Sequence, residues 1–354
     1  MKLLRRTLIF INGILILSLL FGYLRQFTDP GQGSFLTIFS LLYPYIVILL
    51  CICLVLLLLI RSRWLWASLL ALVLTSGNTI RQIGFHIQPD IPVDSTVYTL
   101  STLNIKNNFR HKKMDQSTAF IEDFKKKNST FLVLQEISGD QIRNIANALK
   151  YSYDSHQNNQ VSKGFLAIFS QYPLTHIKSI ENAEGRTIAL AADIQIQQDT
   201  IRLFNIHLHT NAVTVRAEKF TPESFSKKEG LRAFNDMLRA YSENASLRLD
   251  EIRLINSEVN HSPYPVILAG DANDTPYSPV YRSLRGNRQN AFVKGGLGFA
   301  QTYNGLIVPL KIDHIFLDKT FFVYNTTIEK IDYSDHNPIT TSFSLIRSHL
   351  TANY

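Results

Sequence analysis

Hydrophobic and polar positions are distributed unevenly along the 354-residue chain. Before residue 85 the sequence contains three long uncharged stretches, at residues 7–24, 36–60 and 64–80. The second stretch has 25 residues without a charge, which is long enough for a helix to cross a bilayer, and Pro44 should kink it. The third begins with Trp64 and Trp66, which suit a membrane interface, although a buried helix of a soluble protein can look the same. We therefore predict a transmembrane region over residues 1–84.

Positive charges predict the orientation of this region. Basic residues precede the first stretch and separate the second from the third, whereas the loop between the first and second carries only Arg25. Because cytoplasmic loops are rich in Lys and Arg, the N-terminus and the Arg61–Arg63 turn should be cytoplasmic. Three crossings then make the chain an integral protein of the inner or plasma membrane, with the rest periplasmic or extracellular. Only two crossings would leave it cytoplasmic.

Residues 85–96 contain two prolines and read as an extended linker. From residue 97 the pattern changes to short runs rich in β-formers, typical of strands. These runs cover residues 97–105, 130–135, 165–170, 187–196, 201–208, 266–269, 314–317 and 339–345. Helical patterns cover residues 115–127 and 138–149, with Ser138 as the expected N-cap. Many strands and fewer helices predict two packed sheets covered by helices, and not a doubly wound parallel sheet. Residues 97–354 should form this single domain.

A longer helical pattern lies within residues 210–260, from Leu231 to Val259 at three-to-four spacing. Helical cover for a sheet is the simplest interpretation of this segment. Its Lys227-Lys228 start also suits a substrate rim or a helix lying on the bilayer.

Charge and cysteine content narrow the chemistry of the second part. Of the formal net charge of +8, residues after Thr96 account for +4, from 29 basic and 25 acidic side chains. This excess is too mild to predict nucleic-acid binding by itself. The only cysteines, Cys51 and Cys53, lie in an uncharged stretch, so the predicted domain has neither a disulfide nor a thiolate metal site.

Polar residues end six of the apolar runs or stand directly beside them, where catalytic side chains tend to collect. Each can be explained singly as a turn, a rim residue or a core residue. Together they supply carboxylates, amides and imidazoles, which suit a hard cation such as Mg²⁺ or Mn²⁺ and an anionic transition state. The six are Asn104, Gln135-Glu136, Asn205-x-His207, Asp271-x-Asn273, Asp313 and Asp335-His336.

In this order, the six motifs resemble those of the endonuclease/exonuclease/phosphatase superfamily, the deoxyribonuclease-I-like hydrolases. The resemblance spans residues 97–345 and includes the strand at residues 164–174. It implies an α+β fold, a four-layer α/β/β/α sandwich of two mainly antiparallel sheets, and a divalent-metal-dependent phosphoester hydrolase using Mg²⁺ or Mn²⁺. Ala272 and Gln171 depart from the usual aromatic and basic residues.

The resemblance also implies roles for individual residues. The metal would be bound by Glu136, with Asn104 and Asp335 beside it. Asp271 would activate the attacking water and Asn273 would orient it. The phosphate and its leaving oxygen would contact two imidazoles, His207 and His336, and Asp313 would hydrogen-bond to the second of these.

Anchoring favours a substrate at the membrane, such as a phosphodiester in a lipid headgroup. The alternatives are a nuclease acting on DNA or RNA, and a non-catalytic binding domain on a membrane anchor. The lipid bilayer and a phosphoester substrate, either a lipid headgroup or nucleic acid, are therefore the expected partners, and no protein partner can be inferred from the sequence.

Overall fold

The computed structural model describes residues 2–29, 34–87, 96–106, 114–156, 165–210, 228–304 and 309–346. Contacts divide the chain into two compact units. The helical unit contains residues 1–83, 211–249 and 274–283, and the sheet unit contains residues 84–210, 250–273 and 284–354. The division differs from a simple cut after residue 84, because two later segments group with the N-terminal helices.

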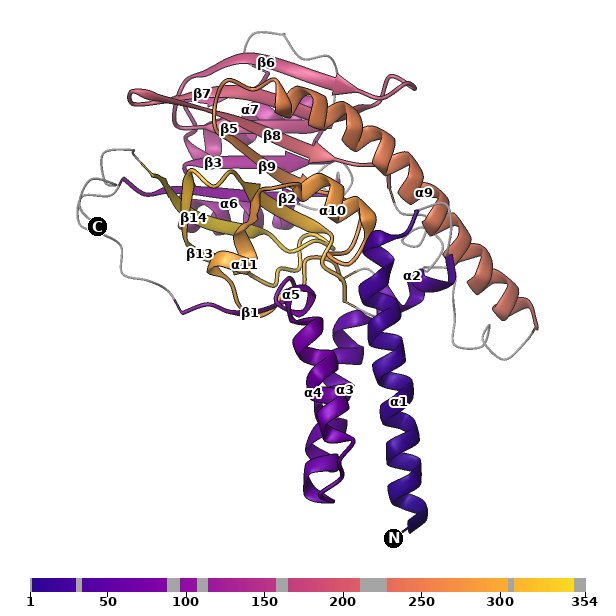
Figure 1. Cartoon of the computed structure of the whole chain (residues 1–354). Coiled ribbons are helices and arrows are strands. Elements are labelled where there is room, and N and C mark those ends of the chain that lie inside the picture. The colour runs from indigo at the N-terminus through magenta and orange to yellow at the C-terminus, as the bar shows by residue number, and fades with distance from the viewer. Residues whose placement is uncertain are drawn as a thin grey trace. The chain divides into compact units, whose positions relative to one another are not determined.

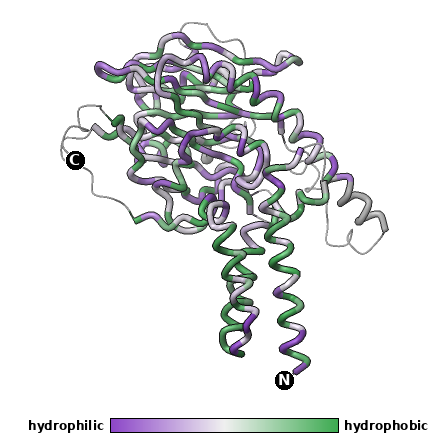
Figure 2. The backbone as a smooth tube through the Cα atoms, in the orientation of Figure 1, coloured by the Kyte–Doolittle hydropathy of each residue, from purple (hydrophilic) through white to green (hydrophobic). Residues whose placement is uncertain are grey.

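The N-terminal part of the helical unit consists of apolar helices (Figures 1 and 2). Residues Lys2–Phe27 are long and apolar enough to cross a membrane. The second uncharged stretch forms two helices bent by 67° at a break, and the kink expected at Pro44 is this break, with Pro44 in the first turn of the second helix. The helices are α1 (Lys2–Leu24), η1 (Arg25–Phe27), α2 (Ser34–Leu41), α3 (Tyr43–Leu59), α4 (Leu65–Leu74) and α5 (Ser76–Thr79).

Some of the polar side chains buried between these apolar helices are paired across them. Ser68 Oγ donates a hydrogen bond of 2.7 Å to Asn12 Oδ1 and so links α4 to α1. Tyr43 packs in an apolar cluster with Leu19, Leu50 and Ala71. Such pairs hold apolar helices together where hydrophobic burial gives little preference for one neighbour over another.

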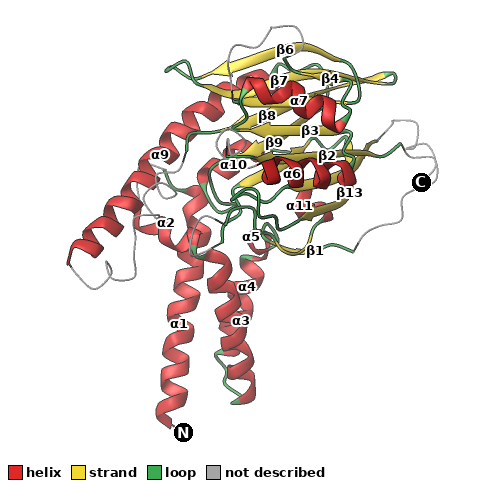
Figure 3. Ribbon diagram, turned by 180° about the vertical axis from the view of Figure 1, so that it is seen from behind, coloured by secondary structure: helices red, strands yellow, loops and turns green. Residues whose placement is uncertain are grey.

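Two six-stranded sheets form the sheet unit, visible as stacked layers in Figures 1 and 3. The first has the order β10-β12-β9-β8-β7-β6 and the second β13-β14-β2-β3-β5-β4. In each sheet one neighbouring pair is parallel, β8 with β9 and β2 with β3, and the other neighbours are antiparallel. The mixed but mainly antiparallel sheets agree with the predicted fold class.

The first sheet contains β6 (Leu174–Glu181), β7 (Thr187–Ile196), β8 (Asp199–His207), β9 (Val266–Asp271), β10 (Gln289–Asn290) and β12 (Asp313–Leu317). The second contains β2 (Tyr98–Asn104), β3 (Phe131–Gln135), β4 (Tyr153–Asp154), β5 (Leu166–Ser170), β13 (Phe321–Ile328) and β14 (Ile339–Leu345). Two short strands, β1 (Ile83–Phe85) and β11 (Leu297–Phe299), form a separate pair. All eight predicted runs are strands.

Alternating side chains on the central strands fill two apolar layers. On β3, Val133 faces the layer between the sheets, whereas Leu132 and Leu134 face the helices. Burying one such side chain stabilises the folded state by about 1.5–3 kcal/mol. The central strands are therefore firmly held, and so are the residues at their ends. The helices are α6 (Met114–Lys127), α7 (Gly139–Leu149), α9 (Lys228–Asn260), α10 (Pro279–Arg285) and α11 (Ala291–Gly295).

Helices α7 and α9 lie where helical patterns are predicted, with two details to add. Ser138 precedes α7 at the N-cap position, but its side chain makes no capping hydrogen bond, so the predicted cap is wrong in that respect. The predicted apolar positions at Leu231 and Phe234 fall on α9, but their side chains lie outside the described residues.

Candidate active site

Strand register places three of the predicted site residues in one row across the first sheet. In the parallel pair of β8 and β9, His207 lies opposite Asp271, and in the antiparallel pair of β9 and β12, Asp313 lies opposite Asp271. Gly270 makes this row possible: its φ is 140°, and a Cβ there would lie 2.1 Å from the Ile206 carbonyl oxygen. The ends of three strands therefore converge at one edge of the sheet.

The second sheet supplies an amide and a carboxylate to the same place. Asn104 is the last residue of β2 and lies opposite Gln135 of β3, which Glu136 follows directly. The sheets are joined just below: Gln135 Nε2 donates to Asn205 Oδ1 at 2.6 Å. Asn205 in turn donates to the carbonyls of Leu134 and Ala167. Asn205 is fully buried, so its amide joins the two sheets beneath the site.

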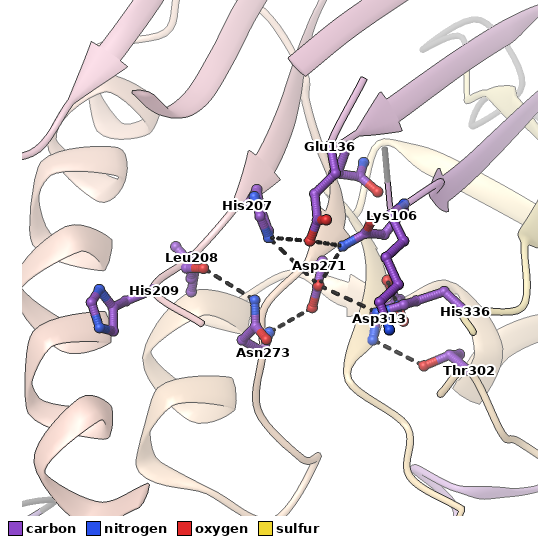
Figure 4. Close-up of polar contacts among 12 residues, drawn as sticks. Lys106, Glu136, His207, Leu208, His209, Asp271, Asn273, Thr302, Asp313 and His336 are labelled. Atoms are coloured by element: carbon purple, nitrogen blue, oxygen red, sulfur yellow. Dashed lines mark hydrogen bonds and ion pairs between the residues drawn. The ribbon is translucent and has the colours of Figure 1, made fainter. Parts of the chain in front are cut away.

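The Asp271 carboxylate lies at the centre of the cluster (Figure 4). Its Oδ2 accepts a hydrogen bond of 3.1 Å from the Asn104 amide, which also donates to Glu136 Oε1 at 2.9 Å. The Nε2 atoms of His207 and His336 lie 3.8 and 3.9 Å from the same oxygen, and His207 Nε2 lies 3.6 Å from Glu136 Oε1. Two carboxylates and two imidazoles thus surround one neutral amide.

Asp313 and His336 form a separate hydrogen-bonded pair on one side of Asp271. His336 Nδ1 lies 2.9 Å from Asp313 Oδ2, so Nε2 is the ring nitrogen that remains for a substrate. Thr302 fixes the start of β12, because its hydroxyl accepts from the backbone amides of Ile312 and Asp313. The pair therefore has a rigid carboxylate and an imidazole of fixed orientation.

Burial and charge shift the proton affinities of these groups in different directions. Burial, with the nearby Asp313 carboxylate, raises the pKa of Asp271 to about 7. Burial lowers the pKa of His207 to about 3, helped by the positive charges of Arg186 and His336. Burial alone would lower the pKa of His336, but the charge and hydrogen bond of Asp313 raise it to about 10. At neutral pH the site thus contains a cationic imidazole, a neutral imidazole and a carboxyl group near its titration point.

Asn273 and Glu136 have left-handed backbone conformations, with φ of 52° and 56°. A non-glycine residue adopts this conformation at a cost and keeps it only when its surroundings hold it there. The Asn273 backbone amide donates to Asp271 Oδ1 at 2.8 Å, and its side chain donates to the Leu208 carbonyl at 3.1 Å. The loop after β9 therefore places the Asn273 side chain beside the central carboxylate (Figure 4).

Seven of the eight predicted site residues are brought together in this way, and Asp335 is arranged differently. Asp335 Oδ2 forms an ion pair of 2.6 Å with Lys106, a partner that the sequence reading did not identify. The other carboxylate oxygen is buried and has no hydrogen-bond partner among the described residues. Lys106 lies two positions after the end of β2 and has a φ of 51°. Its position close to a polar strand end is the feature of the sequence that could have predicted a place in the site.

A second unpredicted group holds the end of β8. Arg186 donates to the His207 carbonyl at 3.3 Å and pairs with Glu251 of α9 at 2.5 Å. Glu251 also accepts from the His209 backbone amide at 2.7 Å. The strand end on both sides of Leu208 is therefore fixed by one buried acid and one arginine.

The donor set of this cluster fits a divalent cation. Ligand atoms of Asp271, Asp313 and His336 all lie within 4.8 Å of one another. The buried Nε2 of His207 has no hydrogen-bond partner among the described residues, and two carboxylates share the single Asn104 amide. Buried carboxylates without a neutralising cation are costly, and oxygen-rich sites suit hard ions.

Comparison with known proteins agrees with this geometry. The sequence profile of the Endonuclease/Exonuclease/phosphatase family matches residues 101–336, and the chain belongs to this family. Members of the family are generally phosphoesterases and nucleases that use a divalent metal. A domain of unknown function (DUF8431) matches residues 5–82. A search of curated proteins finds no match.

Two solved structures illustrate the shared fold. An endonuclease/exonuclease/phosphatase family protein from Bacteroides thetaiotaomicron is 13% identical, with a TM-score of 0.50 over 71% of this chain and 99% of that protein. TDP2 from D. rerio, complexed with a single-strand DNA product, is 16% identical, with a TM-score of 0.50 over 70% and 99%. At these identities the likeness shows the fold alone.

Proposed function

We propose that this chain is a membrane-anchored, divalent-metal-dependent phosphodiester hydrolase that acts on lipid headgroups. The observation that carries the hydrolase proposal is the convergence of Asn104, His207 and His336 on one oxygen of Asp271, with Glu136 beside it. This arrangement offers a base, a cationic imidazole and a neutral imidazole within a few ångströms, which hydrolysis of a charged ester requires.

Each side chain has a role that follows from its surroundings. Asp271, with its pKa raised to about 7, accepts the proton of the attacking water, and the Asn273 amide orients that water. His336, whose pKa is about 10, is protonated and neutralises charge on the phosphate or donates a proton to the leaving oxygen. His207 is neutral and contacts a phosphate oxygen through Nε2, which accepts or donates no hydrogen bond among the described residues. Glu136, with Asn104 and Asp335 nearby, would hold a divalent cation, which would supply further positive charge.

The apolar helices support the anchoring proposal. Lys2–Phe27 suffices for one crossing, and the α2–α3 pair suits a second. Helices α4 and α5 are separated only by Thr75, and the hydrogen bond from Ser68 to Asn12 joins this third segment to α1. Three crossings, with Lys2, Arg5 and Arg6 in the cytoplasm, put the sheet unit on the periplasmic or extracellular side.

The test is a hydrolysis screen of the full chain in nanodiscs. The substrates are bis-p-nitrophenyl phosphate, phosphatidylcholine and sphingomyelin vesicles, plasmid DNA and RNA, each with Mg²⁺ or Mn²⁺ and with EDTA. We expect EDTA-sensitive release of phosphorylated headgroups from vesicles and little cleavage of nucleic acid. No EDTA-sensitive turnover on any substrate would overturn the hydrolase proposal, and cleavage of DNA or RNA in preference to lipid would replace the substrate class. Arg239→Met, at an exposed position of α9, is the matched control.

Alkaline extraction of membranes tests the anchoring separately. We expect the chain to stay in the membrane pellet at high pH, as a protein with spanning helices does. Release into the supernatant would refute the anchor while leaving the hydrolase proposal intact. A cysteine placed at His261, on an exposed turn, should react with an impermeant maleimide added outside intact cells or spheroplasts.

A further inference from the structure

Residues Asp274 to Ser283, which follow the loop after β9, are held by residues at the end of the apolar helices. Asp274 to Ser283 belong to the helical unit, whereas the preceding residues, including Asn273, belong to the sheet unit. Every residue from Asp274 to Tyr281 is buried. A segment this enclosed needs partners for its backbone groups and polar side chains, because unpaired buried polar atoms are costly.

Two consecutive residues after α5 supply such partners. Arg81 Nη1 donates to the Pro276 carbonyl at 2.9 Å and to Gln26 Oε1 at 3.0 Å, and its guanidinium lies 5.2 Å from the centre of the Tyr281 ring. The next residue, Gln82, accepts a hydrogen bond of 3.2 Å from the Tyr277 hydroxyl. Arg81 and Gln82 thus hold Pro276 and Tyr277, which are also consecutive.

The Tyr277 ring is held as well. It stacks on Tyr43 of α3 with a centroid distance of 4.2 Å and an interplanar angle of 28°. Tyr277 also belongs to the apolar cluster formed by α1, α3 and α4. The contact buries two aromatic rings, which contributes beyond simple area burial. The apolar helices therefore contact the segment through a ring, a hydroxyl and a carbonyl.

The link from this segment to catalysis is the strained residue Asn273. Its φ of 52° is left-handed, and a non-glycine residue keeps this conformation when its surroundings hold it there. On the N-terminal side, Asp271 and Leu208 hold it. On the C-terminal side, the next residue is Asp274, and Pro276 follows two positions later. We propose that Arg81 and Gln82 are positioning residues, which hold Pro276 and Tyr277 in place and so restrict the backbone that follows Asn273.

This inference rests on the proposed function for its kinetic readout, but not for its structural one. The variant Arg81→Met keeps an unbranched side chain and removes the donor to Pro276. In the full chain in nanodiscs, with bis-p-nitrophenyl phosphate and Mn²⁺, we expect kcat to fall about tenfold, because small displacements of a positioning group slow the reaction strongly, and KM to stay within about twofold. Arg81→Lys should restore most of the loss, and Arg239→Met should behave as wild type.

Hydrogen exchange gives a readout that does not need activity. The backbone amides of Thr275 and Ser278 donate to Asp274 Oδ1 and to the Thr275 carbonyl, so they report on the segment directly. We expect both to exchange faster in Arg81→Met, with amides of β7 unchanged. Wild-type kcat together with wild-type exchange would overturn the proposal. If Arg81→Met does not fold, Tyr277→Phe removes only the bond to Gln82 and is judged by the same two criteria. If the wild-type chain hydrolyses nothing, the proposed function fails and exchange alone decides this inference.

Discussion

Two buried aspartates three positions apart, Asp271 and Asp274, show how neighbours decide what the same side chain does. Their exposed fractions are 1% and 0%. Asp274 accepts two hydrogen bonds from Arg248, at 3.0 and 3.2 Å, and further bonds from the Tyr241 hydroxyl and the Thr275 amide. Among the residues that the structure describes, the hydrogen-bond donors to the Asp271 carboxylate are neutral, namely the Asn104 side chain and the Asn273 backbone amide. The negative charge of Asp274 is therefore neutralised by a neighbouring cation, whereas that of Asp271 is not.

The difference separates structural chemistry from reactive chemistry. The Asp274 carboxylate is paired with a guanidinium and a hydroxyl, and these contacts give it a structural role. A buried carboxylate near another acid has its pKa raised to about 7, where it can gain and lose a proton at physiological pH. Burial alone therefore does not identify a catalytic aspartate. A buried carboxylate that no neighbouring cation neutralises is the better indication. The following predictions test this contrast.

Asp271→Asn should produce the largest effect. The amide keeps the shape of the side chain but cannot accept a proton from water, so we expect turnover of bis-p-nitrophenyl phosphate to fall at least about 10³-fold. Since the buried charge near Asp313 is removed, thermal stability without metal should be unchanged or slightly higher. Activity is measured with Mg²⁺ and Mn²⁺, and unfolding by calorimetry. A variant with normal kcat would show that Asp271 is not the base.

Asp313→Asn should produce the next largest effect and change the pH profile. In the wild type we expect kcat/KM to rise through about pH 7 as Asp271 loses its proton, and to fall near pH 10 as His336 loses its own. Without the Asp313 carboxylate, the main cause that raises the pKa of His336 is gone. The alkaline limb should therefore move to lower pH, and activity at pH 8 should drop about 100-fold. An alkaline limb that stays in place would contradict the assigned pair.

Asp274→Asn should act mainly on stability. The variant leaves the fully buried Arg248 guanidinium without its counter-ion, and breaking a buried pair from one side costs about 3–5 kcal/mol. We expect a clear fall in the thermal midpoint, together with a loss of kcat that is far smaller than for Asp271→Asn. Replacing both partners, Asp274→Asn with Arg248→Met, should recover part of the stability. Equal losses of kcat in Asp274→Asn and Asp271→Asn would contradict the conclusion that Asp274 is structural and Asp271 catalytic.

How much of this could be read from the sequence depends on the range of the interactions. The β-rich runs and the order of the polar strand ends predict the two sheets and the convergence of seven site residues, because central strands impose a regular pattern. The edge strands β6 and β13 escaped prediction, since both have register shifts and mixed exposure that break the alternation.

Contacts between distant residues could not be predicted where one partner belongs to none of the predicted site motifs. Arg81 and Pro276 are 195 positions apart, and Lys106 and Asp335 are 229 apart. A local pattern contains no information about such pairs. For the same reason the sequence does not show which side chains surround Asp274. Its partners Arg248 and Tyr241 lie 26 and 33 positions away on α9.

Tyr241→Phe should give the smallest effect, and it tests whether the Asp274 carboxylate has a structural role alone. The change removes one hydrogen bond to Asp274 and keeps the ring, while Arg248 and the Thr275 amide continue to neutralise the carboxylate. We expect the free energy of unfolding to fall by about 1 kcal/mol, the usual worth of one buried hydrogen bond, and kcat to change less than about twofold. Calorimetry and steady-state kinetics on the same preparation measure both quantities. A loss of activity without a loss of stability would mean that the Asp274 cluster takes part in the chemistry, because a satisfied structural carboxylate tolerates the loss of one of several donors.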